Sequence, residues 1–185
     1  MTHDFEESLR RSHAAEDWPE WENIYRTFFP DFASMTKHTR NGYWQAAGVD
    51  RSITLKTGKI VLIDEKVRFR NENGPAFDDI ALETWSDLEK EKPGWVIKPL
   101  LADYIAYAIL PLGRCHLFPV PQLQAAWRQR GEQWRKDFNV IRVPNDRYWT
   151  ECVCVPPDVV YRAIGSCFRA SFLPTDDRFD SREGS

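Results

Sequence analysis

Residues 48–70, GVDRSITLKTGKIVLIDEKVRFR, constrain the fold more than any other stretch of the sequence. Two apolar runs flank Gly58, and this arrangement is typical of two antiparallel strands joined by a tight turn. The second run is interrupted by three consecutive charged residues, Asp64, Glu65 and Lys66. Because buried charges are costly unless they are paired, a strand this apolar needs a specific role for these side chains.

The length of the turn decides which side chains of this hairpin meet. With a three-residue turn, Asp50 lies opposite Asp64, and Lys66 shares their face because side chains alternate along a strand. With a two-residue turn, Asp50 opposes Glu65, which becomes the acid on the metal side, and Arg51 opposes Asp64 as a cross-strand ion pair. The three-residue turn is favoured because it gathers apolar residues of both strands on one face. The alternative stays open because the run IVLI is apolar on both faces.

In either register two carboxylates and Lys66 converge in a buried part of the hairpin. Repulsion between close carboxylates raises a pKa unless a cation binds between them. Oxygen ligands suit Mg²⁺, which takes one or two protein carboxylates together with waters and a substrate phosphate. The pattern therefore predicts a magnesium site in a phosphodiester hydrolase, with Mn²⁺ as a substitute, and its candidate ligands are Asp50, Asp64 and Glu65. Lys66 would orient or deprotonate the attacking water and offset the charge that builds on phosphorus.

The sequence GVDR, a turn, and then IVLIDEKVR resembles the PD-(D/E)XK nucleases, the restriction-endonuclease-like superfamily. The resemblance covers about residues 18–130 and implies a magnesium-dependent endonuclease that cleaves DNA. It maps the first acid onto Asp50 and the (D/E)-x-K triplet onto Asp64 and Lys66. Two positions depart from the family pattern, because Val49 replaces the proline and Glu65 occupies a middle position that is usually apolar.

The same resemblance implies a core of helix, three strands, helix and strand, in which residues 79–86 serve as the third strand. Some members of the family add a helical glutamate from before the first strand, and here Glu22 or Glu20 is the candidate. Gln45 is a further polar candidate upstream of Asp50. Glu83, in the expected third strand, either extends the acidic site or pairs with an arginine.

Local patterns predict the remaining elements. The segment DWPEWENIYRTFFPDF predicts a helix that begins after Asp17, carries Pro19 in its first turn and ends at Pro30. GRCHLFPV predicts a short strand, and PQLQAAWRQRGEQWRK predicts a helix opened by Pro121. FNVIRV and WTECVCV predict two more strands, and PPDVVYRAIG predicts a helix capped by Gly165.

Strands with intervening helices predict an α/β fold. With the resemblance, the expected architecture is a restriction-endonuclease-like core, a central mixed β-sheet flanked by helices. A chain of 185 residues suffices for one domain with a real hydrophobic core. We expect a single nuclease-like domain over residues 1–173, with its core at about residues 18–130 and a C-terminal extension at residues 131–173. The polar composition of residues 174–185 predicts a disordered tail.

The net charge of −3 argues against a chain that coats nucleic acid through bulk charge, so DNA contacts are expected from local basic segments. The candidate contacts are Lys37, His38, Arg40, Arg51, Arg68 and Arg70, and Tyr43 and Trp44 are candidates for stacking on a base. Cutting both strands would need two sites, so a homodimer is plausible. The four cysteines lack zinc-site spacing and are expected to be ordinary thiols.

The N-terminus has no apolar signal region, and no run approaches the length of a membrane span, so a cytoplasmic protein without a membrane partner is expected. Two other classes of function remain open. The chain could keep a nuclease-like fold without turnover and act as a nucleic-acid-binding or protein-interaction module, with the charged triplet as a salt-bridged strand. It could also be an assembly protein with no nucleic-acid role.

Overall fold

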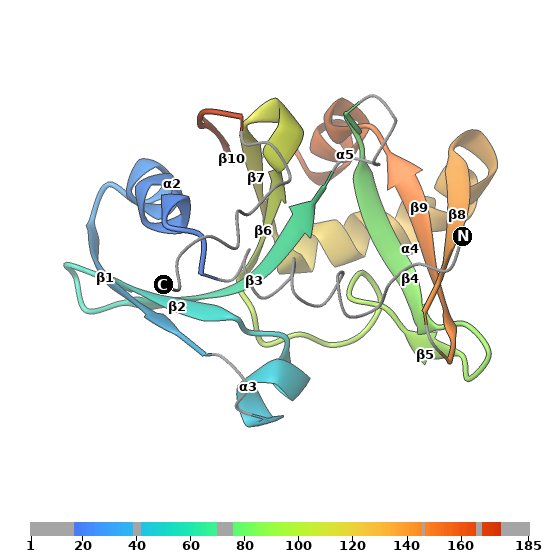
Figure 1. Cartoon of the computed structure of the whole chain (residues 1–185), viewed down its shortest axis with the longest axis horizontal. Helices are drawn as coiled ribbons and strands as arrows, with labels where there is room; N and C mark the ends of the chain where they lie inside the picture. The colour runs from blue at the N-terminus through green and yellow to red at the C-terminus, as the bar shows by residue number, and fades with distance from the viewer. Residues whose placement is uncertain (1–16, 39–41, 70–75, 146, 166–167, 175–185) are drawn as a thin grey trace, which may run out of the picture.

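The computed structural model describes residues 17–38, 42–69, 76–145, 147–165 and 168–174, which form two β-sheets and four α-helices (Figure 1). The larger sheet contains, in spatial order, β1 (Phe32–Lys37), β2 (Arg51–Leu55), β3 (Ile60–Arg68), β6 (Tyr104–Ile109), β7 (Arg114–Pro119) and β10 (Phe168–Ser171). The smaller sheet contains β5 (Lys92–Pro93), β4 (Ile80–Asp87), β9 (Trp149–Val155) and β8 (Asn139–Pro144). The helices are α2 (Glu20–Phe28), α3 (Gly42–Ala47), α4 (Val120–Asp137) and α5 (Pro157–Ile164), with a 3-10 turn at Leu110–Leu112.

The β2–β3 hairpin has the register of the three-residue turn. Arg51 lies opposite Ile63 and Ile53 lies opposite Val61. The backbone N–H of Leu55 donates to the carbonyl of Lys59 over 2.8 Å, which leaves residues 56–58 as the turn. The prediction that Asp50 aligns with Asp64 is therefore confirmed. In this register Asp64 and Lys66 project from one face of the sheet, and Glu65 projects from the other.

The larger sheet is mixed and curled, which confirms the predicted α/β class with a mixed central sheet. Its neighbouring strands are antiparallel except for β3 and β6, which run parallel. Between these two strands the chain leaves the sheet and forms β4 and β5. Figure 1 shows β4 as a green strand beside β9, in the smaller sheet and apart from β3.

The implied role of residues 79–86 needs correction. These residues do form a strand, β4, but it pairs with β9 and β5 and lies outside the central sheet. The place beside β3 belongs to β6, in which all of residues 105–109 are buried. Such a continuously buried strand suits a sheet that is covered on both faces, whereas burial alternates along the first part of β4.

Helices cover both faces of the central sheet. The apolar stripe of α2, which includes Trp21 and Tyr25, packs on one face against Ile53 and Ile63. Helix α4 lies between the two sheets (Figure 1), and its buried side chains belong to a hydrophobic cluster with residues of both sheets. The predicted helices after Asp17, at residues 121–136 and in the segment PPDVVYRAIG are confirmed, and their observed ends lie within about two residues of the predicted ones. None of the helices in the described ranges is both long enough and apolar enough to span a bilayer.

The predicted C-terminal extension is integral to both sheets. β8 and β9 complete the smaller sheet beside β4, and β10 adds an edge strand to β7 in the larger one. Glu151 connects β9 to α4 and β8, since its buried carboxylate accepts from Arg135 of α4 over 2.6 Å and from Arg142 of β8 over 3.3 Å. The tail predicted for residues 174–185 lies, except for Pro174, outside the described residues.

Gly94, in the turn after β5, presses against β4. A Cβ at this position would lie 2.3 Å from the carbonyl oxygen of Glu83, closer than van der Waals contact permits. We expect Gly94→Ala to destabilise the fold by about 1–3 kcal/mol, because the backbone of β4 has to move to make room. Urea denaturation would measure the change in the free energy of unfolding.

Gly42, at the start of α3, provides the matched control, because a Cβ there meets no atom within 4 Å. Gly42→Ala should leave the free energy of unfolding unchanged or raise it slightly. Equal stability of the two variants would mean that the turn does not constrain β4.

Candidate functional site

The site forms where β2 and β3 separate. β2 pairs with residues 60–63 of β3 only, and residues 64–68 continue along β6. Upstream of β2 the chain emerges from α3 through Gly48, whose φ of 67° is a left-handed conformation that suits glycine. The backbone N–H of Asp50 then donates to the carbonyl of Ile63 over 2.9 Å, which keeps the chain before β2 attached to β3.

The Asp50 carboxylate replaces the next backbone hydrogen bond that the pairing of β2 with β3 would otherwise make. Its Oδ2 accepts from the backbone N–H of Glu65 over 2.7 Å. This bond holds Asp50 beside Asp64, and each of the two carboxyl groups is within hydrogen-bonding reach of the other. Two carboxyl groups therefore lie close together at the end of the hairpin, and, in addition to burial, the charge of Asp50 raises the pKa of Asp64.

Asp64 is almost fully buried, with 4% of its side chain exposed, and it forms an ion pair with the Lys66 ammonium. Burial raises the pKa of Asp64 to about 7, because the opposing effect of Lys66 is partly cancelled by Asp50. Burial lowers the pKa of Lys66, but the carboxylates of Asp64, Asp50 and Glu83 outweigh it and the net direction is upward. The Lys66 side chain is 29% exposed, so it connects the buried acids to the surface.

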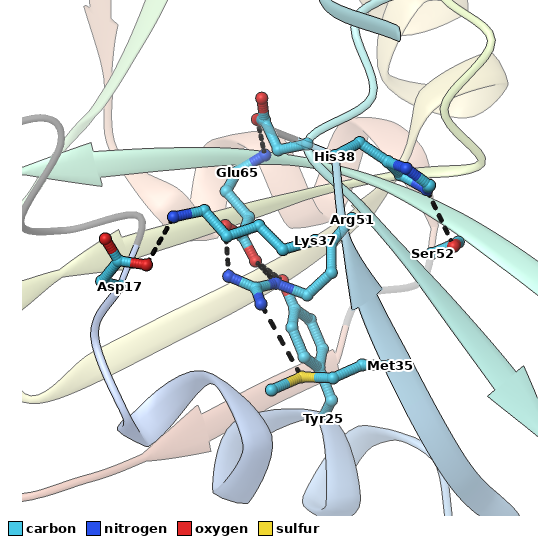
Figure 2. A network of polar contacts seen from close by, with 9 residues as sticks. Asp17, Tyr25, Met35, Lys37, His38, Arg51, Ser52 and Glu65 are labelled. Carbon is cyan, nitrogen blue, oxygen red and sulfur yellow. Dashed lines mark hydrogen bonds and ion pairs between the residues drawn. The ribbon is translucent and has the colours of Figure 1, made fainter. Parts of the chain in front are cut away.

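Glu65 lies on the opposite face and is fully engaged there, as Figure 2 shows. Arg51 Nε and Nη2 donate to its two carboxylate oxygens over 2.6 and 3.2 Å, and the Tyr25 hydroxyl donates to Oε1 over 2.6 Å. Both charged side chains are only 6% exposed. This arrangement corrects two expectations, since Glu65 faces away from Asp50 and Asp64, and Arg51 is buried where DNA cannot reach it.

The predicted helical glutamates do not join the acids. Helix α2 covers the face of the sheet that carries Glu65, whereas Asp64 projects from the other face. Glu22 is half-exposed and accepts from Arg26 over 2.6 Å, and Glu20 accepts from Asn23 over 3.2 Å. Gln45 is exposed on α3. The expectation of a helical acid at this site is therefore corrected, because the helix packs on the wrong side of the sheet.

The predicted nucleic-acid contacts lie in different places. His38 continues β1 beside Asp50, stacks on Trp44 with ring centroids 4.4 Å apart, and contacts Ser52 Oγ over 2.9 Å. Lys37 projects from the opposite face and pairs with Asp17 over 2.5 Å (Figure 2). Arg68 shares the face of Asp64 and pairs with Asp79 over 2.8 Å. Arg40 and Arg70 lie outside the described residues.

The donor set fits magnesium only as a partial ligand shell. Across the described ranges, no three His, Cys, Asp or Glu side chains are arranged to hold a metal ion. Asp50 and Asp64 supply two carboxylates, and Mg²⁺ commonly takes its other ligands from water and phosphate. The raised pKa of Asp64 marks a carboxyl that lacks sufficient positive charge, which a cation would relieve. The described cysteines, Cys115, Cys152 and Cys154, are buried free thiols.

Comparison of this chain with protein-family models, with curated proteins and with solved structures gives no match. The case for a function therefore rests on the residues themselves and on their geometry.

The buried pair between Arg51 and Glu65 yields a stability prediction. Arg51→Met leaves the Glu65 carboxylate buried without its cation, so it should destabilise the fold by about 3–5 kcal/mol. Adding Glu65→Leu should recover most of the lost stability, because the unpaired buried carboxylate is then removed as well. Urea denaturation of both variants would measure the two changes in the free energy of unfolding.

Arg162 provides the control, because it also pairs with a carboxylate, that of Asp158 on α5 over 2.8 Å, but at the surface, with side chains 72% and 64% exposed. Arg162→Met should cost about 0.5 kcal/mol or less. The role assigned to Arg51 would be excluded if its substitution were as mild as that of Arg162.

The pKa of Asp64 predicts how stability depends on pH in the absence of metal. The ordinary value of 3.8 applies to the unfolded chain, and the folded value is about 7. Between these values the folded chain keeps a proton that the unfolded chain has lost, so stability falls as the pH rises. Asp64→Asn removes this dependence. Melting temperatures with EDTA should therefore be higher for the variant than for wild type at about pH 8, and the difference should shrink towards about pH 5.

Asp64→Asn that melts well below wild type at the higher pH would contradict this expectation. In that case the ion pair with Lys66 would stabilise the fold by more than the burial of Asp64 destabilises it.

Proposed function

We propose that this protein is a magnesium-dependent endonuclease of the PD-(D/E)XK type that hydrolyses DNA phosphodiester bonds. One observation carries the proposal: Asp50 and Asp64 face each other where β2 and β3 separate, with Lys66 two residues further along the same face. This is the order and placement that the family resemblance implies. The parallel pairing of β3 with β6 and the helices on both faces of the sheet are compatible with the same core.

In this proposal Asp50 and Asp64 are the metal ligands, and Glu65 is a structural residue. The carboxylates of Asp50 and Asp64 would hold the ion, and its positive charge would offset the negative charge of a reacting phosphate. Asp50 is positioned for this task by its bond to the backbone of Glu65, so its carboxylate does not have to be ordered when the ion binds. Because the pKa of Asp64 is raised to about 7, binding of a cation would favour release of the proton that this carboxyl holds below that pH.

Lys66 acts as a cation in this proposal. The surrounding carboxylates raise its pKa, so the ammonium form predominates at neutral pH. An ammonium group orients the attacking water by donating to its oxygen and offsets the charge that accumulates on the phosphoryl oxygens. Removal of the proton from water then falls to another base or to the solvent. The partial exposure of Lys66 allows a phosphate to approach its Nζ.

His38 and Arg68 are the predicted DNA contacts that flank the acids on their own face. His38 lies on the side of β1 and Arg68 at the end of β3, so a phosphate backbone placed between them would cross Asp50 and Asp64. We retain both as proposed contacts. A homodimer would supply the second active site that a double-strand break requires.

The direct test is an assay on plasmid, linear, single-stranded and branched DNA with Mg²⁺ or Mn²⁺. Wild type should cleave at least one of these substrates, and Asp64→Asn should abolish cleavage because a ligand charge is lost. Lys66→Met should slow cleavage by about 100-fold or more while leaving DNA binding in place.

Glu22→Gln is the matched control, since this acid lies on α2 away from the site, and it should cleave at the wild-type rate. Absence of cleavage by wild type on every substrate would reject the proposal. Equal cleavage by wild type and Asp64→Asn would reject it as well, because the activity would then come from a contaminant.

The ion pair between Lys66 and Asp64 favours a second candidate, a nuclease-like fold that binds nucleic acid without turnover. In that function Lys66 permanently compensates Asp64, and the acids never take a metal. Fluorescence anisotropy with labelled DNA separates the two candidates. A binding module would bind DNA equally with EDTA and with magnesium and would cleave none of it.

A further inference from the structure

Glu83 lies on the strand that the chain forms after it leaves the central sheet, and two contacts hold this strand alongside β3. Arg68 Nη2 donates to Asp79 just before β4, over 2.8 Å. The backbone N–H of Ala81 donates to the Tyr107 hydroxyl over 3.0 Å, and Tyr107 is the residue of β6 that pairs with Lys66. β4 is thus anchored beside the Lys66 end of β3 at two successive points.

Strand alternation then determines where Glu83 projects. Residues 79, 81 and 83 share a face, and this face meets β3, because Asp79 reaches Arg68. A contact of β9 supports this orientation, because Cys154 lies opposite Ala81 and its Sγ accepts from Arg68 over 3.8 Å. The β4–β9 register shifts between Glu83 and Trp85, so Glu83 is the last residue before the irregularity. Bulges of this kind often re-aim a side chain next to a functional site.

Glu83 has no fixed partner among the described side chains, since none of them forms a hydrogen bond or an ion pair with its carboxylate. Its charge nevertheless acts on Lys66, together with those of Asp64 and Asp50. Lys66 carries its ammonium on a flexible four-carbon chain and is partly exposed, so it can change partners without a backbone movement. Gly94 packs directly against Glu83, which limits how far this part of β4 can move away.

The present partner of Lys66 is also the proposed metal ligand. The Lys66 ammonium donates to Oδ1 of Asp64, and a divalent cation at Asp50 and Asp64 would repel the ammonium from that position. Lys66 then needs another carboxylate, and Glu83 is the acid within reach that is not engaged elsewhere in the described structure.

We propose that Glu83 is a positioning residue that accepts the Lys66 ammonium when a divalent cation displaces it from Asp64. This exchange leaves Asp64 free to bind the cation and keeps Lys66 beside the reacting phosphate. The smaller sheet thus contributes to a site whose other members all belong to the larger one. The inference rests on the proposed function, because it assumes a cation at Asp50 and Asp64.

A thermal-shift titration with MgCl₂ tests the exchange without any need for activity. Four chains are compared: wild type, Glu83→Gln, Lys66→Met and the double variant. Wild type should gain melting temperature with magnesium, and Glu83→Gln should need about 10-fold more magnesium for the same gain, as is typical when a partner of a ligand is removed. In the Lys66→Met background, Glu83→Gln should have no further effect, because no ammonium remains to be accepted.

Glu89→Gln is the matched control, since Glu89 is an exposed acid in the turn after β4, and it should respond to magnesium as wild type does. An unchanged response of Glu83→Gln would overturn the inference while leaving the proposed function intact. An equal weakening in both backgrounds would also overturn it, because Glu83 would then be a direct ligand. No response of wild type to Mg²⁺ or Mn²⁺ would instead reject the metal site itself, and the inference with it.

Discussion

The buried contact of Glu65 with Arg51 and Tyr25 is the interaction on which the arrangement of the site depends. It joins β2, β3 and α2 beneath the central sheet. Because side chains alternate along a strand, placing Glu65 on this face places Asp64 and Lys66 on the other. A slip of one residue would exchange the two sets, stranding Glu65 away from its arginine and burying Lys66 under α2.

The three adjacent charges of β3 therefore have two different roles. Glu65 is neutralised by protein groups and stabilises the packing of α2 on the sheet. Asp64 is only partly neutralised, because Asp50 opposes it and, among the residues that the structure describes, Lys66 alone forms an ion pair with it. The protein keeps a carboxyl whose charged form is destabilised by about 4 kcal/mol relative to an unfolded chain, by the conversion of its pKa into free energy. Carboxyl groups with strongly shifted pKa values are common at functional sites.

Much of this could be predicted from the sequence, because the governing signals are local. Gly58 and the apolar alternation around it were sufficient to favour the hairpin register, and the register aligned Asp50 with Asp64. The same register also implies the pair between Arg51 and Glu65, which are diagonal neighbours on one face. The observed pair differs from the predictions that Arg51 contacts DNA and that Glu65 binds a metal, because the two side chains are buried against each other.

Other features left no usable local signal. β1 is short, and its burial pattern is mostly exposed, so the alignment of His38 with Asp50 could not be recognised. Residues 79–86 read correctly as a strand, but a strand does not carry the identity of its neighbours. The helix that carries Glu22 is predicted to within about two residues at each end, yet the side of the sheet on which a helix packs follows from the apolar stripes of both elements together.

The sequence by itself determined several of the elements, the register of the hairpin and the convergence of Asp50, Asp64 and Lys66, because these depend on local patterns, turn geometry and alternation over about twenty residues. Only the tertiary structure decided that β4 joins a second sheet, that α2 lies beneath Glu65, and that Glu83 approaches Lys66 from the other sheet. These outcomes depend on which buried surfaces fit together across the whole chain, and that competition is settled by packing between distant segments.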